Sequence, residues 1–310
     1  MQVEVVNTGT ELMLGQVLNT HLKFFAEALF PLGLRVARQA AVPDGAPIRD
    51  ALLETFGRAD VVLITGGLGP TTDDVTRDIV AELLGLELVH DEEIMKAIAE
   101  RFARRGLQLS PRVRLQALRP RAATVLPNAF GTAPGLYLPA APGLGNAPRA
   151  SPHLFLLPGP PRELHPMFGD FAIPILQRIA PARPDFAMKS YRVVGLGESL
   201  VEEQIGEPLL ALGLELGYCA RPGEVDVRTI GTAEVLSRAE TIILERLGPH
   251  IASQDNRSLE KVIIDLLAAR EETLATAESC TGGCLANDLT NVPGASAVFL
   301  AGFVAYANQA

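Results

Sequence analysis

The chain has 310 residues, of which 48% are hydrophobic and 20% are charged, so it is long enough for two or three globular domains. A net charge of -9 argues against a nucleic-acid partner held by electrostatics. No basic segment followed by an apolar run opens the chain, and no run of 18 apolar residues occurs in it. Its three cysteines are odd in number and form no CxxC pair, which favours reduced thiols. We therefore expect a soluble, cytoplasmic protein without a membrane partner.

Strands and helices alternate through the first 180 residues. The strands are short, nearly continuous apolar runs such as VVLI, and the segments between them have helical spacing. This alternation predicts an α/β fold, a three-layer domain with a parallel sheet covered on both faces. In chain order the predicted strands are 3–9, 35–42, 61–64, 135–139 and 153–159, and the predicted helices are 14–33, 48–59, 75–85, 94–106 and 162–179.

The stretch TGGLGPTTDDVT, residues 65–76, follows the third predicted strand and places three glycines before two acids. A turn without Cβ atoms lets backbone N–H groups approach phosphate, and the start of the next helix adds partial positive charge. Bare carboxylates at Asp73 and Asp74 would repel phosphate unless a hard divalent cation lay between them. The alternative is a tight strand-to-helix turn in which Asp73 or Asp74 caps the helix.

Four polar or glycine-rich turns follow strands of this predicted sheet: TGTE, VPDG, TGGLGPTTDD and LPGPPRE. Ligands of open parallel sheets bind at the carboxyl ends of the strands, so we expect the four turns to share one pocket. The Pro/Gly/Ala stretch over 139–152 is expected to be a flexible surface loop without a chemical role.

The composition changes near 181–187, and the pattern up to about residue 252 predicts a small α+β module. Its polar turns are rich in acids, so we expect packing or dimerisation here, not nucleic-acid binding. A third unit follows, with a helix, a strand, a glycine turn, a second helix and a final apolar strand. Such a strand needs a sheet around it, so we expect this unit to be incomplete or to be completed by another chain.

Six segments together resemble the CinA family, the competence- and damage-inducible proteins: GTELMLGQVLNTH, TGGLGPTTDDVT, LPNAFGTAPGLYLP, LPGPPRELHPMF, GLGES and AESCTGG. The resemblance runs from residue 8 to the last residue, and the 65–76 motif is its most specific part. It implies a molybdopterin-binding-like domain over 1–180, a KH-like module over 181–252 and the start of a nicotinamide mononucleotide deamidase domain over 253–310. It also implies a homodimer.

The resemblance further implies an ADP-ribose pyrophosphatase that depends on a divalent metal ion and releases AMP and ribose 5-phosphate. Mg²⁺, Mn²⁺ or Co²⁺ is the expected cofactor, with K⁺ as a further candidate. Both family activities would serve the recycling of pyridine nucleotides. Two alternatives stay open: a nucleotide- or pterin-binding regulator of competence or DNA-damage responses without turnover, and a transferase that adenylylates a pterin.

In the first domain, Asp74 is the first choice for holding the cation, because it aligns with the single acid of the related molybdopterin motif. Asp73 is a second metal ligand or a helix cap, and Glu11 is a catalytic candidate that would bind or support the cation. Asp44 follows the second predicted strand and would contact a ribose or the metal, with a plain turn role as the alternative. For Glu163 the alternative is an ordinary acid at the start of a helix. None of the five histidines has ligand spacing, and we expect all five to be non-catalytic. The expected substrate-binding residues are Thr8, Gly9, Asp44, Gly66, Gly67, Gly69, Thr71, Thr72 and Glu163.

In the third unit, AESCTGG places Ser279 at a strand-to-helix turn, and the resemblance makes it the nucleophile of amide hydrolysis. Helix capping is the alternative for Ser279, and Cys280 is a weaker nucleophile because this unit has no histidine to activate it. The family's lysine base would follow Ala310, so we expect no deamidase activity unless a partner supplies the missing residues. The expected substrate-binding residues of this unit are Thr281, Gly282, Gly283 and Tyr306.

Overall fold

The computed structural model describes residues 1–142, 150–180 and 186–309. The chain divides into two compact units, Met1–Arg183 and Pro184–Ala310. Half of the expected surface loop over 139–152 lies outside the described residues, as does most of the composition change over 181–187. Within the described part, no helix combines the length and the apolar character that crossing a bilayer requires.

The first unit is built on a sheet with the strand order β2-β1-β3-β8-β7-β6. Its parallel strands are β1 (Val3–Thr8), β2 (Val36–Val42), β3 (Val61–Thr65) and β8 (His153–Leu157). Two antiparallel strands complete it, β7 (Gly135–Leu138) and β6 (Thr124–Leu126). The expected α/β fold with a mostly parallel sheet is confirmed. Since β2 and β3 lie on opposite sides of β1, the connections reverse direction between β1 and β3, at a topological switch point.

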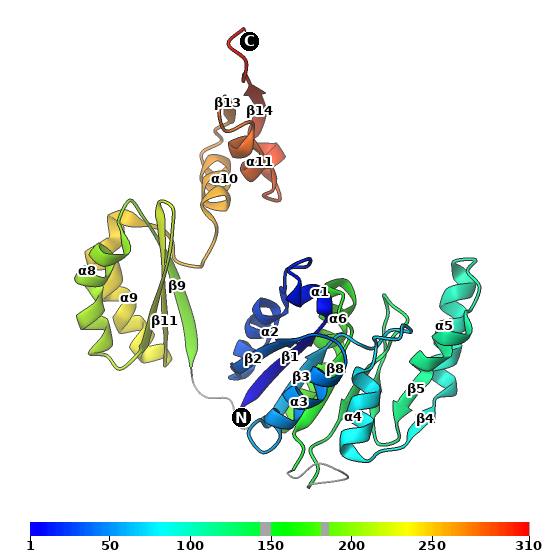
Figure 1. Ribbon diagram of the computed structural model, residues 1–310. Helices are drawn as coiled ribbons and strands as arrows, with labels where there is room; N and C mark the ends of the chain where they lie inside the picture. The colour runs from blue at the N-terminus through cyan, green and yellow to red at the C-terminus, as the bar shows by residue number, and fades with distance from the viewer. Residues whose placement is uncertain (143–149, 181–185, 310) are drawn as a thin grey trace. The chain divides into compact units, whose positions relative to one another are not determined.

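Alternate residues of the buried strands face two separate cores, because successive side chains of a strand point to opposite faces. Ile64 packs on one face with α3 (Ala46–Thr55) and α4 (Thr76–Leu84). Leu63 packs on the other with α2 (His21–Leu29), α6 (Pro161–Met167) and α7 (Ile173–Ile179). Figure 1 shows α2 and α3 on opposite faces of the sheet. A π-helical segment, Phe168–Ala172, joins α6 to α7.

A smaller subdomain of the first unit carries α5 (Glu92–Arg104) and the short antiparallel pair β4 (Leu88–His90) and β5 (Leu118–Pro120). Asp91 begins α5 by accepting hydrogen bonds from the backbone N–H groups of Glu93 and Ile94, at 3.1 and 3.2 Å. A 3-10 segment, η2 (Pro111–Ala117), packs against the buried face of α5. This subdomain forms one wall of the pockets described below.

The helix predicted over 14–33 is wrong in its first half. A single turn, α1 (Thr10–Met13), precedes a non-helical loop, and α2 begins only at His21. Gly15 adopts a φ of 68°, which ends the first turn. Leu18 is 84% exposed, so its helical spacing from Leu22 and Phe25 does not reflect a buried helix face.

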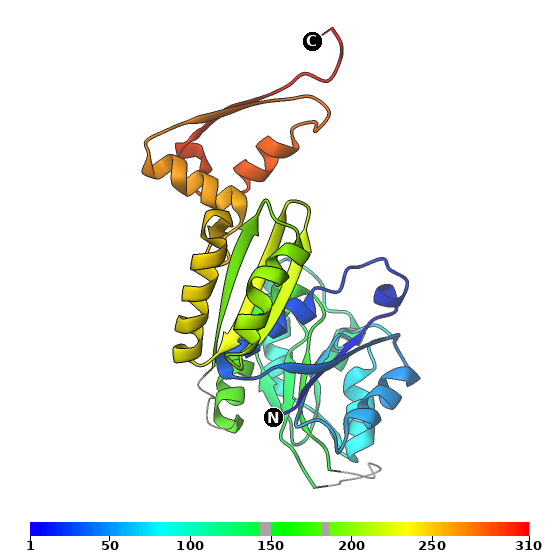
Figure 2. The same cartoon turned by 90° about the vertical axis from the view of Figure 1, so that its left-hand side faces the viewer.

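In the second unit, residues 187–253 form an antiparallel sheet in the order β10-β11-β9-β12. Both helices of this part lie on the same face of that sheet (Figures 1 and 2), and their apolar residues share one core with it. This is the α+β pattern expected from the sequence, while the KH likeness stays a prediction. The elements are β9 (Ala187–Val194), α8 (Glu198–Leu210), β10 (Glu215–Arg221), β11 (Glu224–Gly231), α9 (Ala233–Leu247) and β12 (Ile251–Ser253).

Residues 256–309 contain α10 (Leu259–Ala269), β13 (Leu274–Glu278), α11 (Cys284–Thr290) and β14 (Phe299–Val304). The two strands pair in parallel, and a small core around Ile264 and Leu289 holds the helices to them. Leu300 and Phe303 on β14 remain 68% and 66% exposed, respectively.

Candidate functional site

The turns after β1, β2, β3 and β8 converge on one pocket of about 370 Å³ at the carboxyl edge of the first unit's sheet. The paired register of β1, β3 and β8 brings their ends level, because Asn7, Thr65 and Leu157 are neighbours across the three strands. The shared pocket expected from the sequence is therefore present. The candidates that line it are Thr8, Gly9, Glu11, Asp44, Gly66, Gly67, Gly69, Asp73, Asp74 and Glu163.

The glycines allow the turns to pack closely at this edge. Gly66 has a φ of 97°, and a Cβ there would meet the backbone oxygen of Thr8 at 2.5 Å. Gly67 has a φ of 67°, and its Cβ would collide with the hydroxyl of Thr76. Such positions exclude other residues on both conformational and steric grounds. The turn after β3 is thus held against β1 and the start of α4.

The expected phosphate cradle is smaller than the sequence suggested. The backbone N–H of Gly66 donates to the oxygen of Leu157 at 3.0 Å, so it does not point to a ligand. In the described residues, the N–H groups of Gly67, Leu68 and Gly69 have no protein acceptor. These three consecutive donors are the ones available to an anion.

Asp74 is tied into the turn, and neither aspartate caps α4. One carboxylate oxygen of Asp74, Oδ2, accepts from the backbone N–H of Thr71 at 2.8 Å and also from the Thr71 hydroxyl. Helix α4 starts after Val75, without a side-chain cap. The capping alternative for Asp73 and Asp74 is therefore wrong, because the chain makes an extra turn before the helix begins.

The exposed carboxyl of Asp73 has a pKa below its usual range, lowered first by the Thr71 hydroxyl and then by its own backbone N–H. Thr71 has one hydroxyl proton, so it serves only one of the two aspartates at a time. Both threonines of the turn, Thr71 and Thr72, are exposed and do not line the pocket. Thr71 supports the aspartates and is not placed to contact a ligand there.

The other three acids of the pocket differ in how they are engaged. Asp44 accepts from the backbone N–H and hydroxyl of Thr10, at 2.9 and 3.0 Å, so it has the turn role left open above. Glu163 lies in the first turn of α6 and accepts from the amide of Asn128 at 2.8 Å through one oxygen. Glu11 makes no side-chain hydrogen bond within the described part of the chain.

The acids of this pocket have the chemistry of metal ligands but do not form a complete metal site by themselves. No three His, Cys, Asp or Glu side chains of the described residues gather closely enough to enclose an ion alone. Mg²⁺ is commonly held by one or two carboxylates, phosphate oxygens and water. In the described part of the chain, the second carboxylate oxygen of Asp74 has no protein donor. The same holds for one carboxylate oxygen of Glu163 and for both of Glu11. The set consists of hard oxygen donors, which suits Mg²⁺ or Mn²⁺.

Gln116 is a pocket residue that sequence reasoning missed. It lies on η2, its side chain is 3% exposed, and it lines the pocket. Its Oε1 has no hydrogen-bond partner among the described residues. Buried polar atoms normally have partners, so a ligand or water in the pocket would satisfy this side chain. No sequence signal marked it, because it lies almost 50 residues from the glycine turn.

A buried polar network supports the pocket from behind. The Asn7 amide donates to the Thr65 hydroxyl at 2.8 Å and lies 3.3 Å from Nδ1 of His21. Burial lowers the pKa of His21, an effect opposed by its hydrogen bond to the Gly159 backbone and reinforced by His165. His21 therefore joins β1 and β3 to the Gly159 turn, which lines the pocket. His21 is not among the residues that line the pocket. Its expected non-catalytic role stays a prediction.

The residues expected to take part in amide hydrolysis lie in the last part of the second unit, and their arrangement differs from that of the first unit's pocket. Ser279 and Thr281 are exposed, and Gly282 and Gly283 adopt φ values of 62° and 94°. The carboxylate of Glu278 accepts from the backbone N–H groups of Leu285 and Ala286 at 2.9 and 2.8 Å. An acid thus occupies the start of α11, beside the expected substrate-binding residues Gly282 and Gly283. In this part of the described chain, no hydrogen bond joins Ser279 to a base, and Tyr306 is 74% exposed.

Comparisons with known proteins bear on both units. The family described as "Probable molybdopterin binding domain" matches residues 4–178, and the family described as "CinA C-terminal domain" matches residues 256–310. A CinA-like protein of Akkermansia muciniphila is 42% identical over 311 residues, covering 100% of this chain and 73% of that protein. A protein of Moorella thermoacetica described as competence-damage inducible is 39% identical over 318 residues, covering 100% of this chain and 75% of that protein.

Among solved structures, the crystal structure of the protein CinA "with unknown function" from Thermoplasma acidophilum is 29% identical to this chain. The structural match covers 56% of this chain and 99% of the Thermoplasma acidophilum chain, with a TM-score of 0.48.

Proposed function

The chain belongs to the CinA family, and from that premise we propose that the pocket of its first unit hydrolyses ADP-ribose, or a related nucleotide pyrophosphate, to AMP and ribose 5-phosphate. The observation that carries the proposal is the meeting, in one pocket, of free backbone N–H groups with carboxylates that keep an unpaired oxygen. The N–H groups suit a diphosphate. The carboxylates would repel it without a cation, so the two features together favour a metal-bridged diphosphate.

The cation would be held by Asp74 and Asp73, with phosphate oxygens and water as its other ligands. When bound, a divalent ion such as Mg²⁺, Mn²⁺ or Co²⁺ neutralises diphosphate charge and makes water a better nucleophile. K⁺ remains a further candidate cation. Glu163 and Glu11 border the same space and limit where the negatively charged ligand can lie.

The residues of this chain divide the work of the reaction. The N–H groups of Gly67, Leu68 and Gly69 donate to oxygens of the phosphorus that is attacked, where negative charge increases in the transition state. Glu11, which has no competing donor in the described part, accepts the proton of the attacking water. The oxygen of that water bonds to phosphorus, and the bridging P–O bond breaks, so the second phosphate leaves with the bridging oxygen.

The test is a screen of nucleotide pyrophosphates against several divalent ions, with liberated AMP as the readout. We expect AMP release from ADP-ribose only when a divalent ion is present, and its loss on chelation with EDTA. A protein that binds ADP-ribose without releasing AMP would instead be a regulator that recognises nucleotides. Transfer of AMP onto a pterin, with ATP as donor, would identify the transferase alternative.

For the region that matches the CinA C-terminal domain, we infer that nicotinamide mononucleotide amide hydrolysis would use Ser279 as nucleophile. A serine hydroxyl is weak without an adjacent base, and Ser279 has none within hydrogen-bond distance in the described part of the chain. We therefore expect this chain to release no ammonia from nicotinamide mononucleotide. Turnover that Ser279→Ala abolishes would contradict this expectation.

A further inference from the structure

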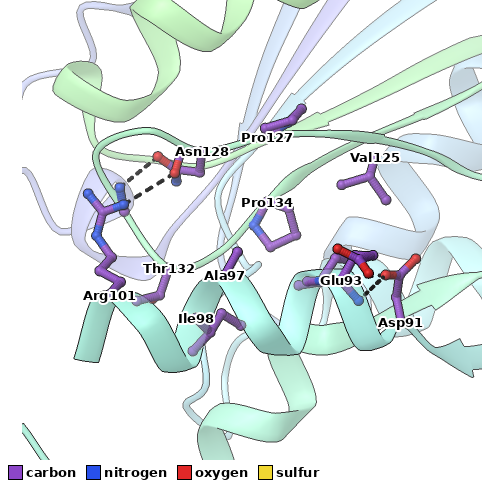
Figure 3. A pocket seen from close by; sticks show the side chains of 12 residues that line it. Asp91, Glu93, Ala97, Ile98, Arg101, Val125, Pro127, Asn128, Thr132 and Pro134 are labelled. Carbon is purple, nitrogen blue, oxygen red and sulfur yellow. Dashed lines mark hydrogen bonds between the residues drawn. The ribbon is translucent and has the colours of Figure 1, made fainter. Parts of the chain in front are cut away.

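A second pocket, of about 430 Å³, lies next to the first in the same compact unit. The two pockets share Thr132 as a lining residue, so the loop around this residue lies between them. Figure 3 shows Val125, Pro127 and Pro134 on one side of the second pocket and the α5 side chains on the other. Its volume falls in the range of small-molecule sites.

The separating loop is firmly held. Arg101 on α5 donates to the backbone oxygens of Asn128 and Ala129, at 3.2 and 2.7 Å. The Asn128 amide donates to the backbone oxygen of Ala133 and to Glu163, at 2.7 and 2.8 Å. Glu163 lines the first pocket and Asn128 lines the second, so this hydrogen bond fixes the two pockets relative to each other. A ligand that spans both would meet preformed walls.

The chemistry of the two pockets differs. The first has free N–H donors and carboxylates, as described above. Most of the second pocket's wall is apolar, and its main apolar residues are Ile94, Ala97, Ile98, Val125, Pro127 and Pro134. Among the described residues that line it, Arg101 is the one cationic side chain, and two of its nitrogens already donate to backbone oxygens while its buried Nε has no partner. The acids Asp91 and Glu93 would repel phosphate. The second pocket therefore suits an uncharged, largely apolar group.

We propose that the second pocket receives the heteroaromatic base of the nucleotide whose diphosphate lies in the first pocket. The inference rests on the proposed function, because it takes the first pocket as the diphosphate site. In ADP-ribose, the group of matching chemistry is the adenine ring. The second ribose is polar throughout and carries no apolar face of this kind. The AMP half thus lies towards α5 and the ribose 5-phosphate half lies away from it.

Isothermal titration of the full chain with AMP and with ribose 5-phosphate, both with Mg²⁺, tests this arrangement. Ala97 is exposed and lines the second pocket, so Ala97→Phe fills the pocket without altering a buried residue. Ala103→Phe is the matched control, since Ala103 is exposed on the same helix but does not line the pocket. Ala97→Leu adds less volume and serves if the phenylalanine variant does not fold.

We expect Ala97→Phe to weaken AMP binding about tenfold or more, the size of a lost apolar pocket contact. Ribose 5-phosphate binding should be unchanged, and Ala103→Phe should bind both compounds as the parent does. Three results would each overturn the inference. The parent and both Ala97 variants could bind AMP equally, the variants could lose affinity for AMP and ribose 5-phosphate to the same extent, or the parent could fail to bind AMP. The titration measures binding without turnover. If Ala97→Phe weakens AMP binding but the parent hydrolyses no nucleotide pyrophosphate, the proposed function is refuted and the base pocket is not.

Discussion

The carboxylate of Asp74 lies in the space that a side chain at position 69 would occupy. A Cβ on Gly69 would come within 2.9 Å of the Asp74 carboxyl carbon and collide with one of its oxygens. The absence of a side chain at Gly69 therefore leaves room for the Asp74 carboxylate. Hydrogen bonds donated by Thr71 fix the orientation of that carboxylate. The glycines and acids of this turn form one arrangement, in which free N–H groups and a carboxylate lie side by side.

The tight packing of the glycine turn predicts an unequal response to two alanine substitutions. Gly67 and Gly15 have nearly the same φ, 67° and 68°, but only Gly67 has a neighbour, the Thr76 hydroxyl, where the new Cβ would lie. Gly15→Ala should lower the free energy of unfolding by about 1 kcal/mol, the cost of a left-handed residue. Gly67→Ala should cost about 1–3 kcal/mol more, because the turn must also move away from Thr76.

Urea denaturation of both variants measures this difference. Equal destabilisation of the two would contradict the packing described for the turn.

The buried Gln116 side chain is expected to lower the free energy of unfolding of the unliganded protein and to contribute to nucleotide binding. Its Oε1 is buried without a partner in the described residues, a state that costs about 1–3 kcal/mol. Gln116→Met keeps the size of the side chain and removes the unpaired oxygen, so the unliganded protein should become more stable, by about 1 kcal/mol. AMP release should fall, because the nucleotide loses a polar partner in the pocket.

Thermal unfolding and the rate of AMP release are measured on the same preparations, with exposed Gln108→Met as the control. A variant that is less stable than the parent, with unchanged activity, would show that Gln116 has only a packing role.

The burial of His21 predicts that the free energy of unfolding decreases in mild acid. Its pKa is lowered from 6.5 in the folded chain, mainly by burial, so the unfolded chain takes up this proton at a higher pH. The free energy of unfolding should therefore decrease as the pH falls from about 6.5 towards the folded pKa, by at most about 1.4 kcal/mol per pH unit for this group. Burial also lowers the pKa of His153, which contributes in the same direction.

Urea denaturation from pH 7.5 to 5 measures this slope. His21→Gln should flatten the slope and leave the share of His153. An unchanged slope in His21→Gln would contradict the burial of a neutral ring in the network.

The parallel sheet and the shared pocket could be predicted because they depend on local signals with a direct geometric consequence. Apolar runs ending in glycine-rich turns identify buried strands, and their carboxyl ends must meet at one edge. The acids Glu11, Asp73, Asp74 and Glu163 could be assigned to that edge for the same reason.

Features that depend on tertiary context could not be predicted. The late start of α2 depends on the left-handed Gly15, and the lack of a cap from Asp73 or Asp74 on α4 depends on the extra turn formed by Thr71 and Asp74. Whether the Gly66 N–H faces a ligand depends on its bond to Leu157, about 90 residues away in the sequence. The second pocket is formed by α5 and the loop at Asn128, which no sequence spacing relates to each other.

The most direct measurement of the central claim is metal-dependent AMP release from ADP-ribose by the parent chain and by Asp74→Asn. Asparagine can still accept from the Thr71 N–H, so the turn and the melting temperature should be retained, as in the control Asp50→Asn at an exposed site. With the negative charge lost, AMP release should fall about 100-fold or more. Unchanged AMP release by Asp74→Asn, or release by the parent that persists in EDTA, would contradict a metal-bridged diphosphate in this pocket.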